Sequence, residues 1–145
     1  MLEGTIHIYT PKHNFQNFDE ARQWAKENIV GSYKNDDTGN VISISKTAID
    51  KYISASAVLK SVDKDVHLSV LTTLPCLIVA SILKETKEDR DNNQDIKGIL
   101  RFYGAVNYEN ATYTVKITVK SYSIGQNKAY SYEVMKNPDN LLSGL

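Results

Sequence analysis

The sequence has a single cysteine, Cys76, and only three prolines in its 145 residues. One cysteine excludes a disulfide framework within the chain and a cysteine-based zinc site. No apolar stretch approaches the roughly 18 residues that a membrane-spanning helix requires. The 17 basic residues (Lys and Arg) balance the 17 acidic ones (Asp and Glu), so the formal net charge is zero. Domains that bind long nucleic acids mainly through charge are basic overall, and any basic surface on this chain must therefore be local.

Several common chemical signatures are also missing. The sequence contains no glycine-rich phosphate loop, no metalloprotease helix motif and no nucleophile elbow. Its three histidines, His7, His13 and His67, stand in separate segments, and no pair has the spacing of metal ligands. The acidic turn at residues 35–40 lacks the spacing of an EF-hand. We therefore expect no metal and no cofactor. The first residues lack the layout of a signal peptide, and we expect a cytoplasmic protein without a membrane partner.

The clearest pattern spans residues 97–120, where apolar and polar residues alternate on both sides of Glu109 and Asn110. It predicts a β-hairpin with those two residues as its turn. Pairing outward from the turn creates one apolar face, with the pairs Tyr108–Ala111, Val106–Tyr113, Gly104–Val115, Phe102–Ile117 and Leu100–Val119. A shift of one residue would mix the two faces, so the pattern specifies the register.

The opposite face of this hairpin is polar. Its predicted pairs are Asn107–Thr112, Ala105–Thr114, Tyr103–Lys116, Arg101–Thr118 and Ile99–Lys120. Side chains of Arg, Lys and Thr bind phosphate groups, and Tyr rings stack on bases. The same residue types form ordinary cross-strand pairs on solvated sheet faces, which is the commoner case. Tyr130 and Tyr132, from a later strand, are expected to join this face.

The rest of the chain predicts an α+β domain with helices on one face of a meander sheet. The expected elements are a strand at 5–10, a helix capped by Asn17, a hairpin over 31–45, a short helix at 48–54, a break at 54–60, a long helix at 63–83, a mobile loop at 84–97 and a last strand at 128–136. Pro75 should kink or split the long helix near residues 72–73. We expect one domain over residues 1–145, with a flexible tail at 137–145.

Three side chains of the predicted helices have particular expectations. Trp24 has helical spacing with other apolar residues and is expected to anchor the core. Cys76 lies in the apolar half of the long helix and is expected to be a buried, inert thiol. His67 lies in the first turns of the same helix. It is either an ordinary, partly exposed histidine or a general acid or base that faces the sheet, since the pKa of histidine lies near neutrality.

Four stretches resemble a known family, namely TGNVISISKTAIDKYIS from Thr38, SVDKDVHLSVLTTLPCLI from Ser61, IKGILRFYGAVNYENATYTVKITVKSY from Ile96 and KAYSYEV from Lys128. Over residues 31–136 the chain resembles the large polyvalent-protein-associated domains, in particular the third type. Such domains occur in very large proteins of phages and conjugative elements and in short standalone proteins. The family is assigned to the barnase–EndoU–RelE-like fold of metal-independent ribonuclease toxins.

The resemblance implies N-terminal helices and a long kinked helix that pack on a curved antiparallel sheet, with the site on that sheet. It implies a metal-independent endoribonuclease of toxin type or, alternatively, a catalytically inactive protein- or RNA-binding module of a mobile element. The expected partner is accordingly RNA or a cognate protein. We expect catalytic roles for His67, Arg101, Lys116 and Tyr103 and substrate binding by Thr118, Lys120 and Tyr132.

Overall fold

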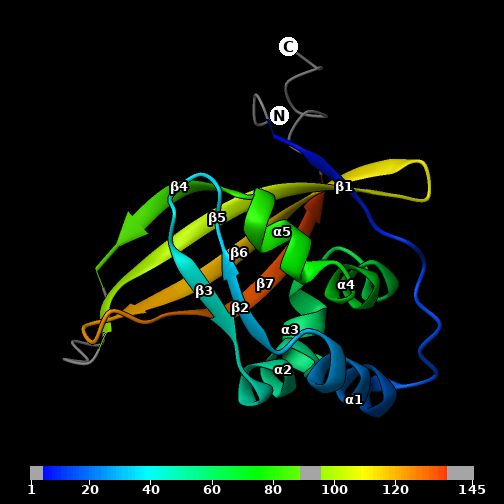
Figure 1. Ribbon diagram of the computed structural model, residues 1–145. Helices are drawn as coiled ribbons and strands as arrows, with labels where there is room; N and C mark the ends of the chain where they lie inside the picture. Colours follow the sequence, from blue (N-terminus) through cyan, green and yellow to red (C-terminus); the bar gives the residue numbers. More distant parts are fainter. Residues whose placement is uncertain (1–4, 89–95, 137–145) are drawn as a thin grey trace.

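The computed structural model describes residues 5–88 and 96–136. Within these residues five helices pack on a curled sheet of seven strands that forms a half-barrel (Figure 1). This arrangement confirms the predicted α+β class. The elements in chain order are β1 (His7–Tyr9), α1 (Phe18–Asn28), β2 (Gly31–Lys34), β3 (Val41–Ile44), α2 (Lys46–Tyr52), α3 (Ala55–Lys60), α4 (Lys64–Leu71), α5 (Leu74–Ala80), β4 (Ile82–Lys87), β5 (Ile96–Tyr108), β6 (Ala111–Tyr122) and β7 (Asn127–Lys136).

The sheet is built around the three long strands β5, β6 and β7. Its strand order is β1-β5-β6-β7-β3-β2, and β4 also pairs with β5. Neighbouring strands run antiparallel except at two places, where β1 pairs with β5 and β3 pairs with β7 in parallel. The short strands thus extend the predicted three-stranded meander on both sides, and the whole sheet curls around the helices (Figure 1).

The β5–β6 hairpin has the predicted register. Every predicted pair is present, from Tyr108–Ala111 beside the turn to Ile99–Lys120. The turn residues Glu109 and Asn110 have φ angles of 44° and 65°. Positive φ at both positions is the geometry of a type I′ turn, whose twist suits a two-residue hairpin connection. The strict alternation of the sequence and the turn geometry therefore agree.

Polar side chains cap four of the five helices. The Asn17 side chain, for example, accepts a hydrogen bond from the Glu20 backbone N–H at 2.8 Å, as predicted. Helix α4 ends at Leu71 and α5 begins at Leu74, so the expected long helix is split at residues 72–73 by Pro75, again as predicted. Its predicted end at residue 83 is wrong, because the chain turns at Ser81 into β4.

Two segments that were expected to lack regular structure have it. The predicted break at 54–60 is helix α3, which Ser54 caps and whose Val58 is buried. The loop predicted from residue 84 begins instead with most of β4. Among the described strands β4 pairs with β5 alone, and charged side chains are tolerated on such an edge strand. The end of that predicted loop, residues 96–97, is the start of β5, while residues 89–95 and the tail predicted for 137–145 lie outside the described residues.

The core lies between the inner face of the sheet and the helices. It contains the predicted apolar face of the hairpin, including Phe102, Val106 and Ile117. Cys76 is exposed, contrary to the prediction, because α5 turns Leu74, Leu77 and Ile78 inward instead. Trp24 is half-buried and packs against the edge of the core. None of the helices in the described part of the chain is long and apolar enough to cross a membrane.

Candidate functional site

The polar face of the β5–β6 hairpin forms the floor of a depression of about 350 Å³ on the outer side of the sheet. Helix α3 and strand β7 form its sides. Its lining residues are Ala57 and Lys60 of α3, Ile99 and Arg101 of β5, Lys116, Thr118 and Lys120 of β6, and Tyr130, Ser131, Tyr132 and Glu133 of β7. Four of these side chains are cationic and one is a carboxylate, so a chain without net charge concentrates positive charge here.

An irregularity of β7 decides which tyrosine reaches this face. The register of β6 with β7 shifts between Thr118 and Val119, which leaves Tyr130 as an extra residue on β7. A bulge of this kind re-aims side chains. The Tyr130 side chain is consequently 38% exposed and lines the depression. Tyr132 was expected on the same face as Tyr130, because the two residues would point the same way in a regular strand. The Tyr132 ring is buried on the core side.

Two carboxylates flank the cations of the depression. Glu133 Oε1 lies 4.0 Å from Nζ of Lys116, its cross-strand partner. Glu85 of β4 accepts hydrogen bonds from the Tyr103 hydroxyl at 2.7 Å and from Arg101 Nη1 at 3.3 Å. The bond from Tyr103 lowers the pKa of Glu85, while burial and the Glu85 carboxylate raise the pKa of Tyr103 to about 12. At neutral pH Tyr103 is therefore a hydrogen-bond donor that holds Glu85 beside Arg101.

Arg101 retains donor capacity in this arrangement. Its side chain is 28% exposed, and its Nε atom is buried without a hydrogen-bond partner among the described residues. A buried donor without a partner is costly. The guanidinium group has five N–H donors in a planar fork that suits an oxyanion. Arg101 can therefore bind a phosphate group with the guanidinium donors that Glu85 leaves free.

His67 lies on the opposite side of the sheet, inside the core. Its Nε2 donates to the Tyr52 carbonyl at 2.9 Å, and its Nδ1 accepts from the Ser61 hydroxyl at 2.6 Å. Its ring stacks on Tyr132 with the two ring centroids 4.2 Å apart. Burial lowers the pKa of His67 to about 4, against a weaker raising effect of the Tyr52 carbonyl. The imidazole is therefore neutral at neutral pH and does not line the depression.

The same network joins the helices to β7. The Ser61 hydroxyl also accepts a hydrogen bond from the Val134 backbone N–H at 2.9 Å. The Tyr132 hydroxyl donates to the His67 carbonyl at 2.7 Å, and the Tyr52 hydroxyl donates to a carbonyl of β7. Every polar group named here has a partner, which is the usual state of buried polar groups. The contacts of His67 and Tyr132 are those of residues that hold the fold together.

The structure brings together most, but not all, of the predicted site residues. Arg101, Lys116, Thr118 and Lys120 line one depression, and Tyr103 lies beside it through its bond to Glu85. The His67 side chain does not line it. Tyr132 is among the lining residues, but its ring packs in the core against His67. Their predicted roles in catalysis and substrate binding stay predictions.

Sequence reasoning missed two carboxylates at this site. Glu133 could have been found by extending the hairpin register into β7, because it pairs directly with Lys116. Glu85 could not have been found in this way, because its segment has the composition of a loop and becomes a strand only by pairing with β5. Lys60 was missed for a similar reason, since it lies in the helix that was expected to be a break.

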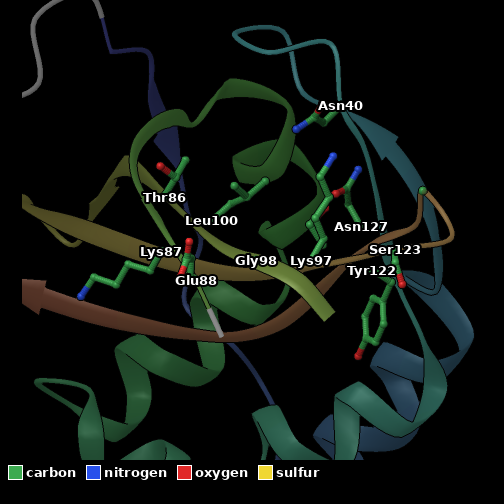
Figure 2. A pocket seen from close by; sticks show the side chains of 12 residues that line it. Asn40, Thr86, Lys87, Glu88, Lys97, Gly98, Leu100, Tyr122, Ser123 and Asn127 are labelled. Carbon is green, nitrogen blue, oxygen red and sulfur yellow. The ribbon is translucent and has the colours of Figure 1, made fainter. Parts of the chain in front are cut away.

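A larger cavity of about 590 Å³ lies at the open end of the half-barrel, beside Glu88. Figure 2 shows Asn40 and Asn127 on one side of it, Thr86 on the other and Leu100 between them. Its lining has two lysines and one carboxylate, and the remaining groups are mostly amides, hydroxyls and backbone. Such groups can hold a polar ligand, but they concentrate less charge than the depression on the outer face does. In the described part of the chain no group of three or more His, Cys, Asp or Glu side chains is placed to hold a metal ion.

The fold and the site define a small α+β domain with a basic depression on the outer face of a half-barrel sheet. Residues 13–130 match the family model described as large polyvalent protein-associated domain 3, and the chain belongs to that family. The match includes α1, which precedes the expected start at residue 31, and ends at Tyr130 in β7. No curated protein and no solved structure matches the chain.

Proposed function

We propose that this domain binds RNA in the depression on its outer sheet face and cleaves it by a metal-independent, toxin-type mechanism, in the setting of a phage or conjugative element. The observation that carries the proposal is the local concentration of charge. Lys60, Arg101, Lys116 and Lys120 converge on one hollow of a chain whose net charge is zero. Cationic side chains that converge in this way bind the phosphate backbone of nucleic acids.

Cleavage of RNA by its own 2′-hydroxyl needs a base, groups that stabilise charge on the phosphorane, and an acid. Glu133 is the carboxylate among the cations and would accept the proton of the 2′-hydroxyl. The 2′ oxygen would then bond to phosphorus, and the bond from phosphorus to the 5′ oxygen would break, which leaves a 2′,3′-cyclic phosphate. Arg101 and Lys116 would stabilise the charge on the phosphorane oxygens. Lys120, which also lines the depression, would give a proton to the leaving 5′ oxygen.

One observation favours a second candidate, an RNA-binding module that does not cleave. The imidazole of His67, which the sequence suggested as acid or base, is buried in the core and bonded to Ser61 and Tyr52. The lining of the depression contains no histidine. A domain that binds phosphate through Arg101 and Lys116 without an efficient acid would retain RNA binding and lose turnover.

The experiment that tests both candidates is incubation of the purified protein with labelled RNA in EDTA. We expect cleavage by the wild type. Glu133→Gln keeps the size of the side chain and removes the base, so it should lower the rate at least about 100-fold. The double variant Arg101→Ala/Lys116→Ala should lose both cleavage and binding. The charge-matched control is Lys34→Ala/Lys46→Ala, because both lysines are exposed and lie outside the depression.

The outcomes separate the candidates. Cleavage that is lost in Glu133→Gln and retained in the lysine control would support the ribonuclease. Binding without cleavage, abolished by Arg101→Ala/Lys116→Ala, would support the binding module instead. If the folded wild type neither binds nor cleaves RNA, or if the double variant equals the lysine control, the depression is not an RNA site and both candidates are wrong.

A further inference from the structure

A second cavity of about 470 Å³ adjoins the depression on the far side of Tyr130. It opens between α2, α3 and β7. Four residues line both cavities, namely Ala57, Lys60, Tyr130 and Ser131. The two hollows therefore share a wall and form one groove that crosses Tyr130. Each hollow has the volume of a small-molecule site, about 300–1,000 Å³, so the groove offers room for more than one nucleotide.

The second hollow carries unbalanced positive charge. Its single carboxylate, Asp50, forms an ion pair with Lys26 of α1 at 2.8 Å. Its lysines, Lys51 and Lys60, form no ion pair with any residue that the structure describes, and neither does Lys120 in the neighbouring depression. Among the described residues, these three lysines of the groove therefore have no anion that balances their charge.

Lys120 and Lys51 both contact the ring of Tyr130, which lies where the two hollows meet. Nζ of Lys120 lies 3.7 Å from the centroid of the Tyr130 ring, and Nζ of Lys51 lies 4.8 Å from it. Each ammonium group gains from the ring through a cation–π interaction, but the two groups repel each other. A phosphate group beside the ring would attract both. The half-exposed ring would at the same time offer a surface on which a base can stack.

We infer that the ligand of this groove is a single RNA strand that crosses Tyr130, with one phosphate at Arg101 and Lys116 and the next at Lys51 and Lys60. This inference rests on the proposed function and specifies its substrate. A single strand is required because a base can reach the Tyr130 ring only when it is free of its duplex stack. Lys51 is a binding residue of the second hollow and takes no part in the chemistry of the first.

The test compares the binding of a short and a long strand by fluorescence anisotropy. The probes are a dinucleotide and an octanucleotide of 2′-O-methyl uridine, which cannot be cleaved through the 2′ position. Lys51→Ala should weaken binding of the octanucleotide roughly three- to tenfold and leave the dinucleotide unaffected. It should also reduce the slope of log affinity against log salt by about 0.7, the value of one phosphate contact with a single strand. Arg101→Ala should weaken binding of both probes.

The matched control is Lys46→Ala, an exposed lysine of the same helix that lines neither hollow. It should equal the wild type with both probes. If Lys51→Ala also equals the wild type while Arg101→Ala weakens binding, the strand does not cross Tyr130, and the proposed function stands without this inference. If neither probe binds the wild type, the proposed function itself fails.

Discussion

Acidification should destabilise this domain through one side chain, His67. The perturbation is a change from neutral pH to about pH 5, a range in which an ordinary histidine becomes protonated. In the folded protein His67 is completely buried, and burial lowers its pKa to about 4 from the ordinary 6.5. The unfolded chain therefore binds this proton more readily than the folded chain does. Stability is fully present above pH 6.5 and is lost as the pH falls toward 4.

The size of the effect follows from the two pKa values. One pKa unit corresponds to about 1.4 kcal/mol, so the complete loss through His67 is about 3 kcal/mol, reached below the folded-state pKa of about 4. At about pH 5 the unfolded state is almost fully protonated at this site, and the expected loss is about 2 kcal/mol. Domains of this size unfold with free energies of about 5–15 kcal/mol. The loss is therefore large enough to measure.

The assay is urea unfolding followed by circular dichroism at about pH 7 and about pH 5. The wild type should lose about 2 kcal/mol between these conditions. His67→Asn should be less stable at neutral pH, because it gives up the bond to the Tyr52 carbonyl, but it should lack this loss on acidification. His7→Asn, which changes a histidine outside the core, is the matched control and should lose as much as the wild type. Titration of the His67 ring by NMR reports the pKa directly.

Two results would refute this reasoning. One is a His67 ring that titrates near pH 6.5 in the folded protein, because the bonds to Ser61 and Tyr52 would then not hold a neutral imidazole. The other is an acid-induced loss that is the same in the wild type and in His67→Asn. In that case groups other than His67 would cause the loss between these two pH values.

Two further predictions concern the hairpin. Gly104→Ala should destabilise the protein by about 1–3 kcal/mol, because the new Cβ would lie 3.0 Å from Cδ2 of the buried Leu77 and 3.6 Å from Cβ of Ser81. An unchanged urea midpoint would show that Leu77 moves aside at no cost. Glu109→Gly should stabilise the protein by about 1 kcal/mol, because Glu109 has a φ of 44° in a turn that favours glycine. A lower melting temperature would contradict the assigned turn.

The candidate site could be predicted from the sequence only in part. The four side chains Arg101, Lys116, Thr118 and Lys120 were expected on one face, and they line one depression. They were predictable because they alternate with apolar residues, and an apolar face has to be buried. The same logic placed the Tyr132 ring on the wrong face. The bulge adds one residue to β7, which reverses the faces of the residues beyond it, and the sequence pattern does not reveal this extra residue.

His67 illustrates a second limit of sequence reasoning. In one of its two expected roles His67 faces the sheet, and its ring does stack on Tyr132 of the sheet. A histidine at that position can line a site or complete a core, and its sequence neighbours do not distinguish the two. His67 completes the core because Ser61 and the carbonyl of Tyr52 form hydrogen bonds with both of its ring nitrogens there.

The sequence by itself determined the hairpin, its turn and its register, because alternation and turn chemistry act between residues that are close along the chain. It also determined the helix cap at Asn17 and the break at Pro75, which are local for the same reason. Only the tertiary structure decided that β4 brings Glu85 to Arg101, that the bulge of β7 leaves the Tyr132 ring in the core, and that Tyr130 lies next to Lys51 of α2. These contacts join segments far apart in the sequence. They depend on which strand edges pair and which surfaces the helices cover, and no local pattern encodes that choice.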